Sequence, residues 1–183
     1  MTMNQLIAQL IDLGRQWVAD QRTAFRPLGQ ALSDNQLSEF ARYFDRNLLT
    51  KVRIVTVPAL ENPAFLEQYR PIFAQSSAPV LDFSRMLGIT FVDTVLIVED
   101  AIRNNLNSLI FHELVHVVQY DIVGLDKFIE LFIIGWVNQG FNYAAIPLEM
   151  DAYELQYRYE GDPDSSFDVQ DEVSRRLELV MDD

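Results

Sequence analysis

The chain has 183 residues, of which 49% are hydrophobic, so it is long enough for one domain with a sizeable core and too apolar for general disorder. Its formal net charge of -13 argues against a nucleic-acid partner and against electrostatic docking to anionic lipid, because like charges repel. There is no cysteine, which excludes disulfides and leaves histidine, aspartate and glutamate for a metal site. We expect a single domain over residues 1–183 whose partner is neutral, apolar or basic.

No segment has the pattern of a secretion signal or a membrane span. Residues 1–20 lack a basic leader, and polar side chains interrupt their apolar residues. The most apolar run, Phe128 to Val137, contains Glu130 and is far shorter than the roughly 20 residues needed to cross a bilayer. The sequence therefore predicts a cytoplasmic protein with no transmembrane segment.

Residues 1–46 are predicted to form two scaffold helices. In the first, apolar residues recur at helical spacing, which predicts one buried face. Those residues are Leu6, Leu10, Leu13 and Trp17. The pattern breaks over residues 22–29, around Pro27. A second helix should begin at Ser33, because Ser33 and Gln36 match a capping box and an apolar stripe continues to Phe44.

Two short elements are predicted next. Residues 51–57 are rich in β-branched side chains and are followed by Pro58, which is typical of a strand. Asn62 and the proline after it predict a short helix with Asn62 as its cap, limited by Pro71. Residues 75–79 are predicted to be a polar loop.

A second β-rich stretch covers Ile89 to Val98. Asp93 and Thr94 at its middle form either a tight turn, which makes a hairpin, or part of one bent strand, and the pattern fits both. In either case a strand arrives just before the next helix. An extended peptide could then pair with the edge of that strand.

The chain's only two histidines follow, in the sequence His112-Glu113-Leu114-Val115-His116. At about 3.6 residues per turn, positions four apart lie on the same helix face, so both imidazoles can reach one metal ion. Glu113 lies beside that ion, where a carboxylate can take the proton of a water molecule that attacks a carbonyl. The alternative is that both histidines are ordinary hydrogen-bonded helix residues, but their place within an amphipathic helix favours Zn²⁺ binding.

The histidine helix is expected to run from Asn104 or Asn105 to Tyr120, with Gly124 as a stop signal. Four of its residues are predicted to pack inward: Leu106, Ile110, Leu114 and Val117. Residues 125–137 are apolar on nearly all sides, which favours a buried helix. The other interpretation of Phe128 to Val137 is a lid, or a surface for an apolar partner or a membrane.

A third metal ligand must be a carboxylate or, less often, a tyrosine or amide oxygen, because no other histidine exists. We favour Glu149, in the first turn of a helix over residues 147–157 that could return antiparallel to the histidine helix. Asp151 and Glu154 are the rivals. Glu149 could also be an acid that only stabilises the helix N-terminus.

The chain ends in an acidic segment over residues 161–183, predicted to be a loop and a docked helix. The apolar stripe of that helix is Val169, Val173, Leu177 and Val180. The N-terminal helices, a metal-site core over residues 50–160 and this C-terminal segment together predict an α+β domain. It is expected to be mainly helical, with a small sheet or hairpin beside the histidine helix.

These motifs resemble the gluzincins, the thermolysin-like class of zinc peptidases, in the HELVH sequence and a downstream Glu-x-x-Ala. Resemblance is closer to small uncharacterised bacterial proteins assigned as metallopeptidases, through His-Glu-Leu-x-His-Val-Val-Gln and Pro-Leu-Glu-x-x-Ala-Tyr, within Ile89 to Tyr157. The resemblance implies a zincin-like fold, a peptide or protein substrate, and Zn²⁺ held by His112, His116 and Glu149. It also implies that Glu113 is the general base.

Two features differ from the thermolysin-like pattern. That pattern has an acid four residues after the glutamate ligand, which orients a histidine, and here that position is Tyr153. It also uses a distant histidine for the oxyanion, whereas here an arginine or one of Tyr143, Tyr153 and Tyr157 would have to serve. The sequence thus predicts zinc-dependent peptide-bond hydrolysis. The alternative is a weak or inactive binding module with a structural or vestigial metal site.

Overall fold

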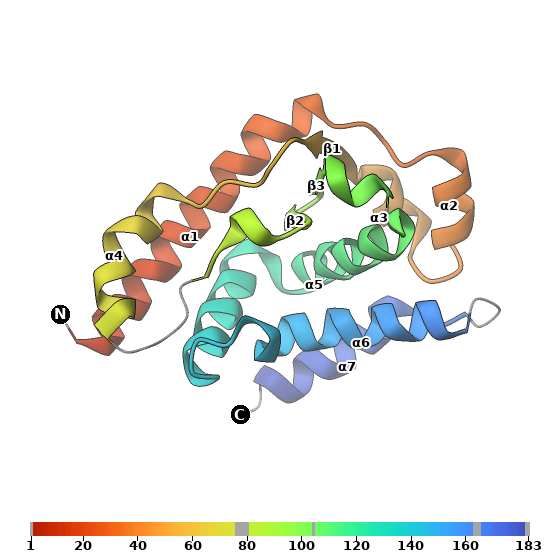
Figure 1. The fold of residues 1–183 in the computed structure, drawn as a ribbon. Coiled ribbons are helices and arrows are strands. Elements are labelled where there is room, and N and C mark those ends of the chain that lie inside the picture. The colour runs from red at the N-terminus through yellow and green to blue at the C-terminus, as the bar shows by residue number, and fades with distance from the viewer. Residues whose placement is uncertain (1, 76–80, 104, 163–165, 182–183) are drawn as a thin grey trace.

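A computed structural model describes residues 2–75, 81–103, 105–162 and 166–181, and it shows the expected mainly helical α+β fold (Figure 1). The helices are α1 (Met3–Phe25), α2 (Asp34–Phe40), α3 (Arg46–Lys51), α4 (Ala64–Gln75), α5 (Leu106–Asn138), α6 (Pro147–Gly161) and α7 (Val169–Met181). The strands are β1 (Arg53–Val57), β2 (Gly88–Phe91) and β3 (Thr94–Val98), and the short 3₁₀ helices are η1 (Arg26–Leu28), η2 (Phe83–Arg85), η3 (Glu99–Arg103) and η4 (Tyr143–Ala145).

The two N-terminal helices form where their stripes and caps predict them, with different ends. α1 continues to Phe25, so it includes the first four residues of the predicted break. Pro27 lies after its end, in η1, at a position where a proline costs no hydrogen bond of α1. Ser33 and Gln36 form the predicted capping box of α2. α2 nevertheless ends at Phe40, and a further helix, α3, begins after Asp45, whose carboxylate accepts hydrogen bonds from the amides of residues 47 and 48.

The sheet has the order β1-β3-β2, with β1 parallel and β2 antiparallel to β3. The stretch from Ile89 to Val98 is therefore a hairpin, which settles the open alternative. Its turn is Val92 and Asp93, one residue earlier than the predicted pair, and Val92 has a positive φ of 62°. Arg22 and Arg26 both pair with the Asp93 carboxylate, which fastens this turn to the end of α1.

The prediction for α4 is wrong in two respects. Pro71 lies inside the helix instead of ending it, on an exposed side where water can hydrate the carbonyl that proline leaves unpaired. Asn62 does not contribute its side chain to the helix: the amide donates to Asp82 and accepts from the Phe83 backbone, which holds η2. Of the loop predicted over 75–79, Gln75 belongs to α4 and the other residues lie outside the described part of the chain.

α5 is the central element, and it bends at Gly124, where φ is 76° and ψ is 166°. Gly124 thus interrupts the helix as predicted, but the chain resumes a second helical half directly afterwards. Figure 1 shows α1 and α4 on one side of the molecule and α6 and α7 together on another, with α5 between them. Pro147 begins α6 as predicted, and the helix continues beyond the predicted Tyr157 to Gly161.

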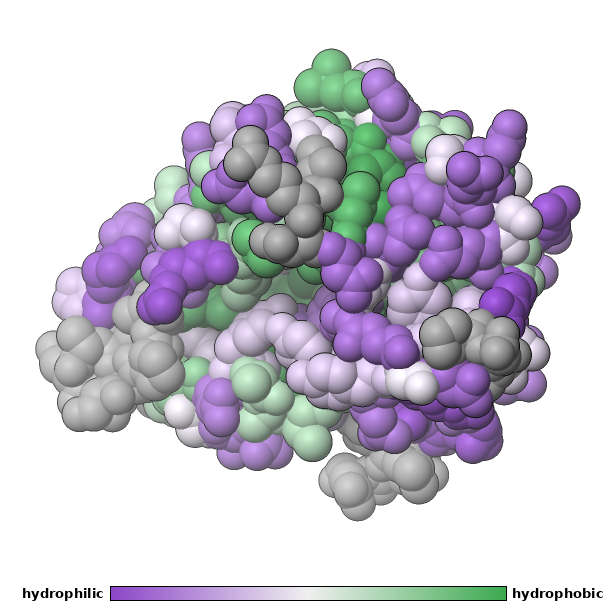
Figure 2. All heavy atoms as spheres, turned by 45° about the vertical axis from the view of Figure 1, so that its right-hand side comes forward, coloured by the Kyte–Doolittle hydropathy of each residue, from purple (hydrophilic) through white to green (hydrophobic). Residues whose placement is uncertain are grey.

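The core joins all these elements. An aromatic cluster around Phe111 connects the end of α2 and the residues after it with α5, α6 and the residues just before α7. It consists of Phe40, Tyr43, Phe44, Phe111, Tyr159 and Phe167. Val169, Val173 and Leu177 of the predicted C-terminal stripe are buried, so α7 is a docked helix. On the face shown in Figure 2, hydrophilic side chains cover most of the surface and hydrophobic ones gather in the upper part of the view. Within the described residues, every helix is too short or too polar to cross a membrane.

Candidate metal centre

His112 and His116 lie one turn apart on the first half of α5 and face the same way. Their Nε2 atoms are 3.2 Å apart, and both side chains are buried. The helix spacing alone produces this pairing, since residues i and i+4 share a face. The predicted inward residues of the same helix, Ile110, Leu114 and Val117, are buried, and Leu106 at its start is partly buried.

Glu149 comes from the first turn of α6, which packs against α5. Its Oε2 lies 3.5 Å from Nε2 of His112, and its Oε1 lies 3.5 Å from Nε2 of His116. Ala152, one turn later, is fully buried, which fits the close approach of the two helices. Among the described residues, these three form a group whose ligand atoms all lie within 4.8 Å of one another. This group could hold a metal ion.

One buried atom tests whether the group fits a cation. Oε2 of Glu149 is buried and has no hydrogen-bond partner, and a buried carboxylate oxygen without a partner is costly. Two neutral imidazole nitrogens and one carboxylate form a known catalytic ligand set for divalent metals, and a cation between them would satisfy that oxygen. The donor atoms therefore fit a metal ion.

Without a metal, the pKa values of Glu149 and His116 depend on each other. Burial by itself raises the pKa of Glu149, but the two histidines outweigh burial and hold the pKa well below its usual range. Burial by itself lowers the pKa of His116, and the Glu149 carboxylate outweighs it and raises the pKa to about 9. A metal cation must replace the proton on His116, so metal binding releases a proton near neutral pH.

Two glutamine side chains stand behind the histidines. Oε1 of Gln119 is 2.7 Å from Nδ1 of His116, and Oε1 of Gln156 is 3.1 Å from Nδ1 of His112. The sequence analysis predicted no function for either glutamine. The detectable signal for Gln119 was its position three residues after His116, one turn along the same helix.

Glu113 points from α5 toward strand β2 and not toward the bulk solvent. The Thr90 hydroxyl donates to its Oε2 at 2.7 Å, and it is 3.1 Å from the Glu113 backbone carbonyl. A Cβ at Gly88 would lie 2.5 Å from Glu113 Oε1, so glycine at this strand position makes room for the carboxylate. Burial raises the pKa of Glu113 above its usual value. Sequence reasoning missed both strand residues.

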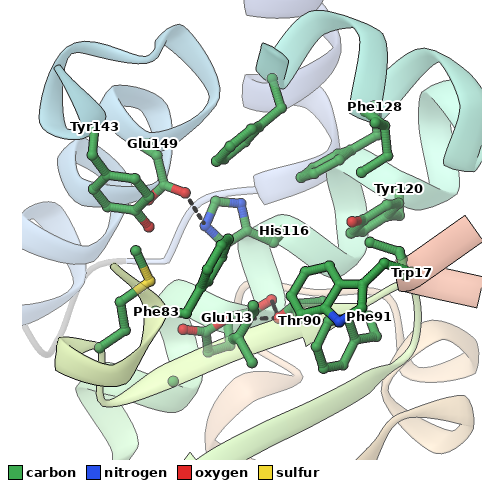
Figure 3. A pocket seen from close by; sticks show the side chains of 16 residues that line it. Trp17, Phe83, Thr90, Phe91, Glu113, His116, Tyr120, Phe128, Tyr143 and Glu149 are labelled. Carbon is green, nitrogen blue, oxygen red and sulfur yellow. Dashed lines mark hydrogen bonds and ion pairs between the residues drawn. The ribbon is translucent and has the colours of Figure 1, made fainter. Parts of the chain in front are cut away.

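A cavity of about 70 Å³ adjoins the candidate ligands (Figure 3). It is lined by Trp17, Val18, Phe83, Met86, Gly88, Ile89, Thr90, Phe91, Glu113, His116, Tyr120, Phe128, Ile129, Phe132, Tyr143 and Glu149. The polar groups His116, Glu113, Thr90, Glu149 and Tyr143 meet in an otherwise apolar and aromatic wall. A volume of this size holds about two water molecules.

The predicted tyrosines lie at different places. Tyr143 lines the cavity beside Glu149, and burial together with that carboxylate raises its pKa well above the usual value. Tyr153 packs against the His112 ring, with centroids 4.5 Å apart, and is not among the described residues that line the cavity. Tyr157 is 66% exposed. The described lining includes no arginine.

The rival carboxylates and the apolar segment also have clear positions. Asp151 and Glu154 both pair with Arg176 of α7, and neither belongs to the group of described residues that could hold a metal. The burial favoured for residues 125–137 is confirmed at Phe128, Ile129, Gly135 and Trp136, whereas Asp126 is exposed and the other residues of this range are partly buried. Phe128 also lines the cavity, so the second half of α5 covers the candidate site.

Comparisons of the chain with protein-family models, with curated proteins and with solved structures find no match.

Proposed function

We propose that this protein is a zinc-dependent peptidase of gluzincin type, with Zn²⁺ held by His112, His116 and Glu149 and a peptide or protein as substrate. One observation supports this proposal most: His116 and Glu149 line the same cavity as Glu113 and Tyr143. A catalytic zinc keeps an open position for water and substrate, and here the ligand set adjoins a space with room for water. The Glu113 carboxylate and the Tyr143 side chain border that space.

Bound zinc would supply Lewis acidity, which polarises a carbonyl and lowers the pKa of water. Glu113 is the proton carrier in this proposal. Its pKa is raised by burial, so its proton affinity is higher than that of an exposed glutamate, and it can accept a proton and return it to a leaving amine. Thr90 orients the carboxylate by its hydrogen bond to Oε2.

Tyr143 is the proposed hydrogen-bond donor to the oxyanion. Burial and the Glu149 carboxylate both raise its pKa, so the hydroxyl keeps its proton at neutral pH and remains a donor. Tyr153, which packs on the face of His112, would act on that ring's orientation and not on the substrate. This division follows from the positions of the two rings relative to the cavity.

The decisive experiment combines metal analysis with a peptide-library cleavage assay, with and without chelator. Glu113→Gln should keep about one zinc per chain and lose roughly 10²–10⁴-fold in cleavage rate, the usual contribution of a general base. The exposed Glu178 provides a control, since Glu178→Gln should leave both quantities unchanged. Full activity in Glu113→Gln, or no metal in the zinc-loaded wild type, would refute the proposal.

A structural metal in a binding module is the second candidate, and the burial of the site favours it. The three ligands are between 3% and 6% exposed, and the adjoining cavity has room for water but not for a large side chain. X-ray absorption spectroscopy on the zinc-loaded protein separates the candidates. An exchangeable water ligand supports the peptidase, and four protein ligands with no water support the binding module.

A further inference from the structure

The Gln119 side chain makes two hydrogen bonds whose directions determine each other. It is fully buried, and its Nε2 donates to the backbone carbonyl of Leu148 at 3.0 Å. Because a carbonyl can only accept, the amide must turn its NH₂ group toward Leu148 and its oxygen toward His116. An amide oxygen can only accept as well. His116 must therefore carry a proton on Nδ1, so Nε2 is the nitrogen that binds a metal after it releases its own proton.

Gln156 fixes His112 by the same reasoning. Its Nε2 donates to Ser108 Oγ at 2.8 Å and to Glu160 Oε1 at 3.2 Å. The Glu160 carboxylate is an acceptor, so it holds the NH₂ group on that side and the Gln156 oxygen on the side of His112. The Ser108 hydroxyl donates to the same Glu160 oxygen, which completes the chain of contacts. His112 thus also has its proton on Nδ1 and its free nitrogen toward the ligand group.

We propose that Gln119 and Gln156 are positioning residues that orient both histidines and set their tautomers for metal binding. In the thermolysin-like pattern, an acid at the position of Tyr153 orients a histidine, and here the two glutamines take over that role. Gln119 has an additional effect, because its bond to Leu148 holds the first turn of α6 one residue before Glu149. A single side chain thereby fixes the placement of two of the three ligands.

The chemistry of an amide differs from that of a carboxylate at this position. A carboxylate behind a metal-binding histidine raises the basicity of the ring, whereas a neutral amide orients it without adding charge. With two neutral imidazoles and one carboxylate, a bound Zn²⁺ would keep a net charge of about +1 in a buried site. The inference rests on the metal centre of the proposed function and does not depend on peptide hydrolysis.

Near-isosteric methionine variants test the proposal, since they remove the hydrogen bonds and keep the volume. Zn²⁺ affinity is measured by chelator competition, and the Nδ1 protons of ¹⁵N-labelled histidine are observed by NMR in the zinc-loaded protein. Q119M should lose the slowly exchanging Nδ1 proton signal of His116 and retain that of His112, and Q156M should do the reverse. Each variant should weaken Zn²⁺ binding about 10–100-fold, the usual effect of removing such a partner.

The exposed Gln68 supplies the control, since Q68M should change neither the affinity nor the histidine signals. Retention of both Nδ1 signals with affinities within twofold of the wild type would overturn the proposal. Gln156 is partly exposed, so Q156M provides the test by itself if Q119M does not fold. Zinc binding without cleavage would refute the peptidase alone, and failure of the wild type to bind Zn²⁺ would overturn both.

Discussion

Gly88→Ala should destabilise the protein through Glu113 alone. The added Cβ would lie 2.5 Å from Glu113 Oε1, 3.0 Å from Cδ and 3.2 Å from Cγ. Nonbonded heavy atoms prefer separations of roughly 3.5 Å, so the carboxylate or strand β2 must shift by about 1 Å. Glu113 cannot move freely, because it is buried and its Oε2 accepts the Thr90 hydrogen bond. Overpacking of this kind costs about 1–3 kcal/mol.

The same substitution should be harmless once the carboxylate is removed. Alanine is favoured over glycine inside a strand by roughly 0.5–1 kcal/mol, so Gly88→Ala should be neutral or stabilising in a Glu113→Ala background. Urea unfolding of the metal-free wild type, the two single variants and the double variant measures this coupling. We expect a coupling energy of about 1–3 kcal/mol. An equal cost of Gly88→Ala in both backgrounds would show that the strand, and not Glu113, opposes the methyl group.

Three further predictions test the ligand set, the hairpin turn and the bend in α5. Glu149→Gln should weaken Zn²⁺ binding by more than the ~10–100-fold expected of a residue behind a ligand, whereas Asp151→Asn should not; equal dissociation constants would remove Glu149 from the site. Burial by itself raises the pKa of Asp93, but its ion pair with Arg22 outweighs burial and lowers it. The stability that Asp93 provides is therefore present above the unfolded-state pKa of ~3.9, and it is lost as the pH falls through the lower folded-state pKa. Asp93→Asn should therefore cost about 1–2 kcal/mol at neutral pH in this partly exposed pair, less at pH below about 4, and a pH-independent cost in urea unfolding would contradict the assignment. The methyl group of Gly124→Ala would meet no atom within 4 Å, but the φ of 76° and ψ of 166° at this position are accessible almost only to glycine. The substitution should therefore cost about 1–3 kcal/mol of stability, and an unchanged melting temperature in a thermal scan would disprove this reasoning.

Local sequence patterns determined the parts of this protein that depend on neighbouring residues. The spacing of His112 and His116 places two imidazoles on one helix face wherever that helix packs. The same is true of the capping box at Ser33 and of the apolar stripe of α1, since both act within one or two turns. The sequence also placed an interruption at Gly124, but it predicted the end of the helix there, and the structure shows a bend within a longer helix.

The tertiary structure decided which distant residues meet. Glu149, Asp151 and Glu154 lie within two turns of one helix, and the sequence could only rank them. The packing of α6 on α5 brings Glu149 to the histidines, while Arg176 of α7 pairs with the other two.

The surroundings of the site were also beyond the sequence, because they depend on contacts between residues far apart in the chain. Thr90 comes within hydrogen-bonding reach of Glu113 only when β2 packs against α5. Gln119 determines the tautomer of His116 only because α6 brings the Leu148 carbonyl to its other end. The sequence by itself determined two candidate ligands and a candidate base on one helix. The packing of α6 and β2 against that helix decided the third candidate ligand and the orientation of all of them.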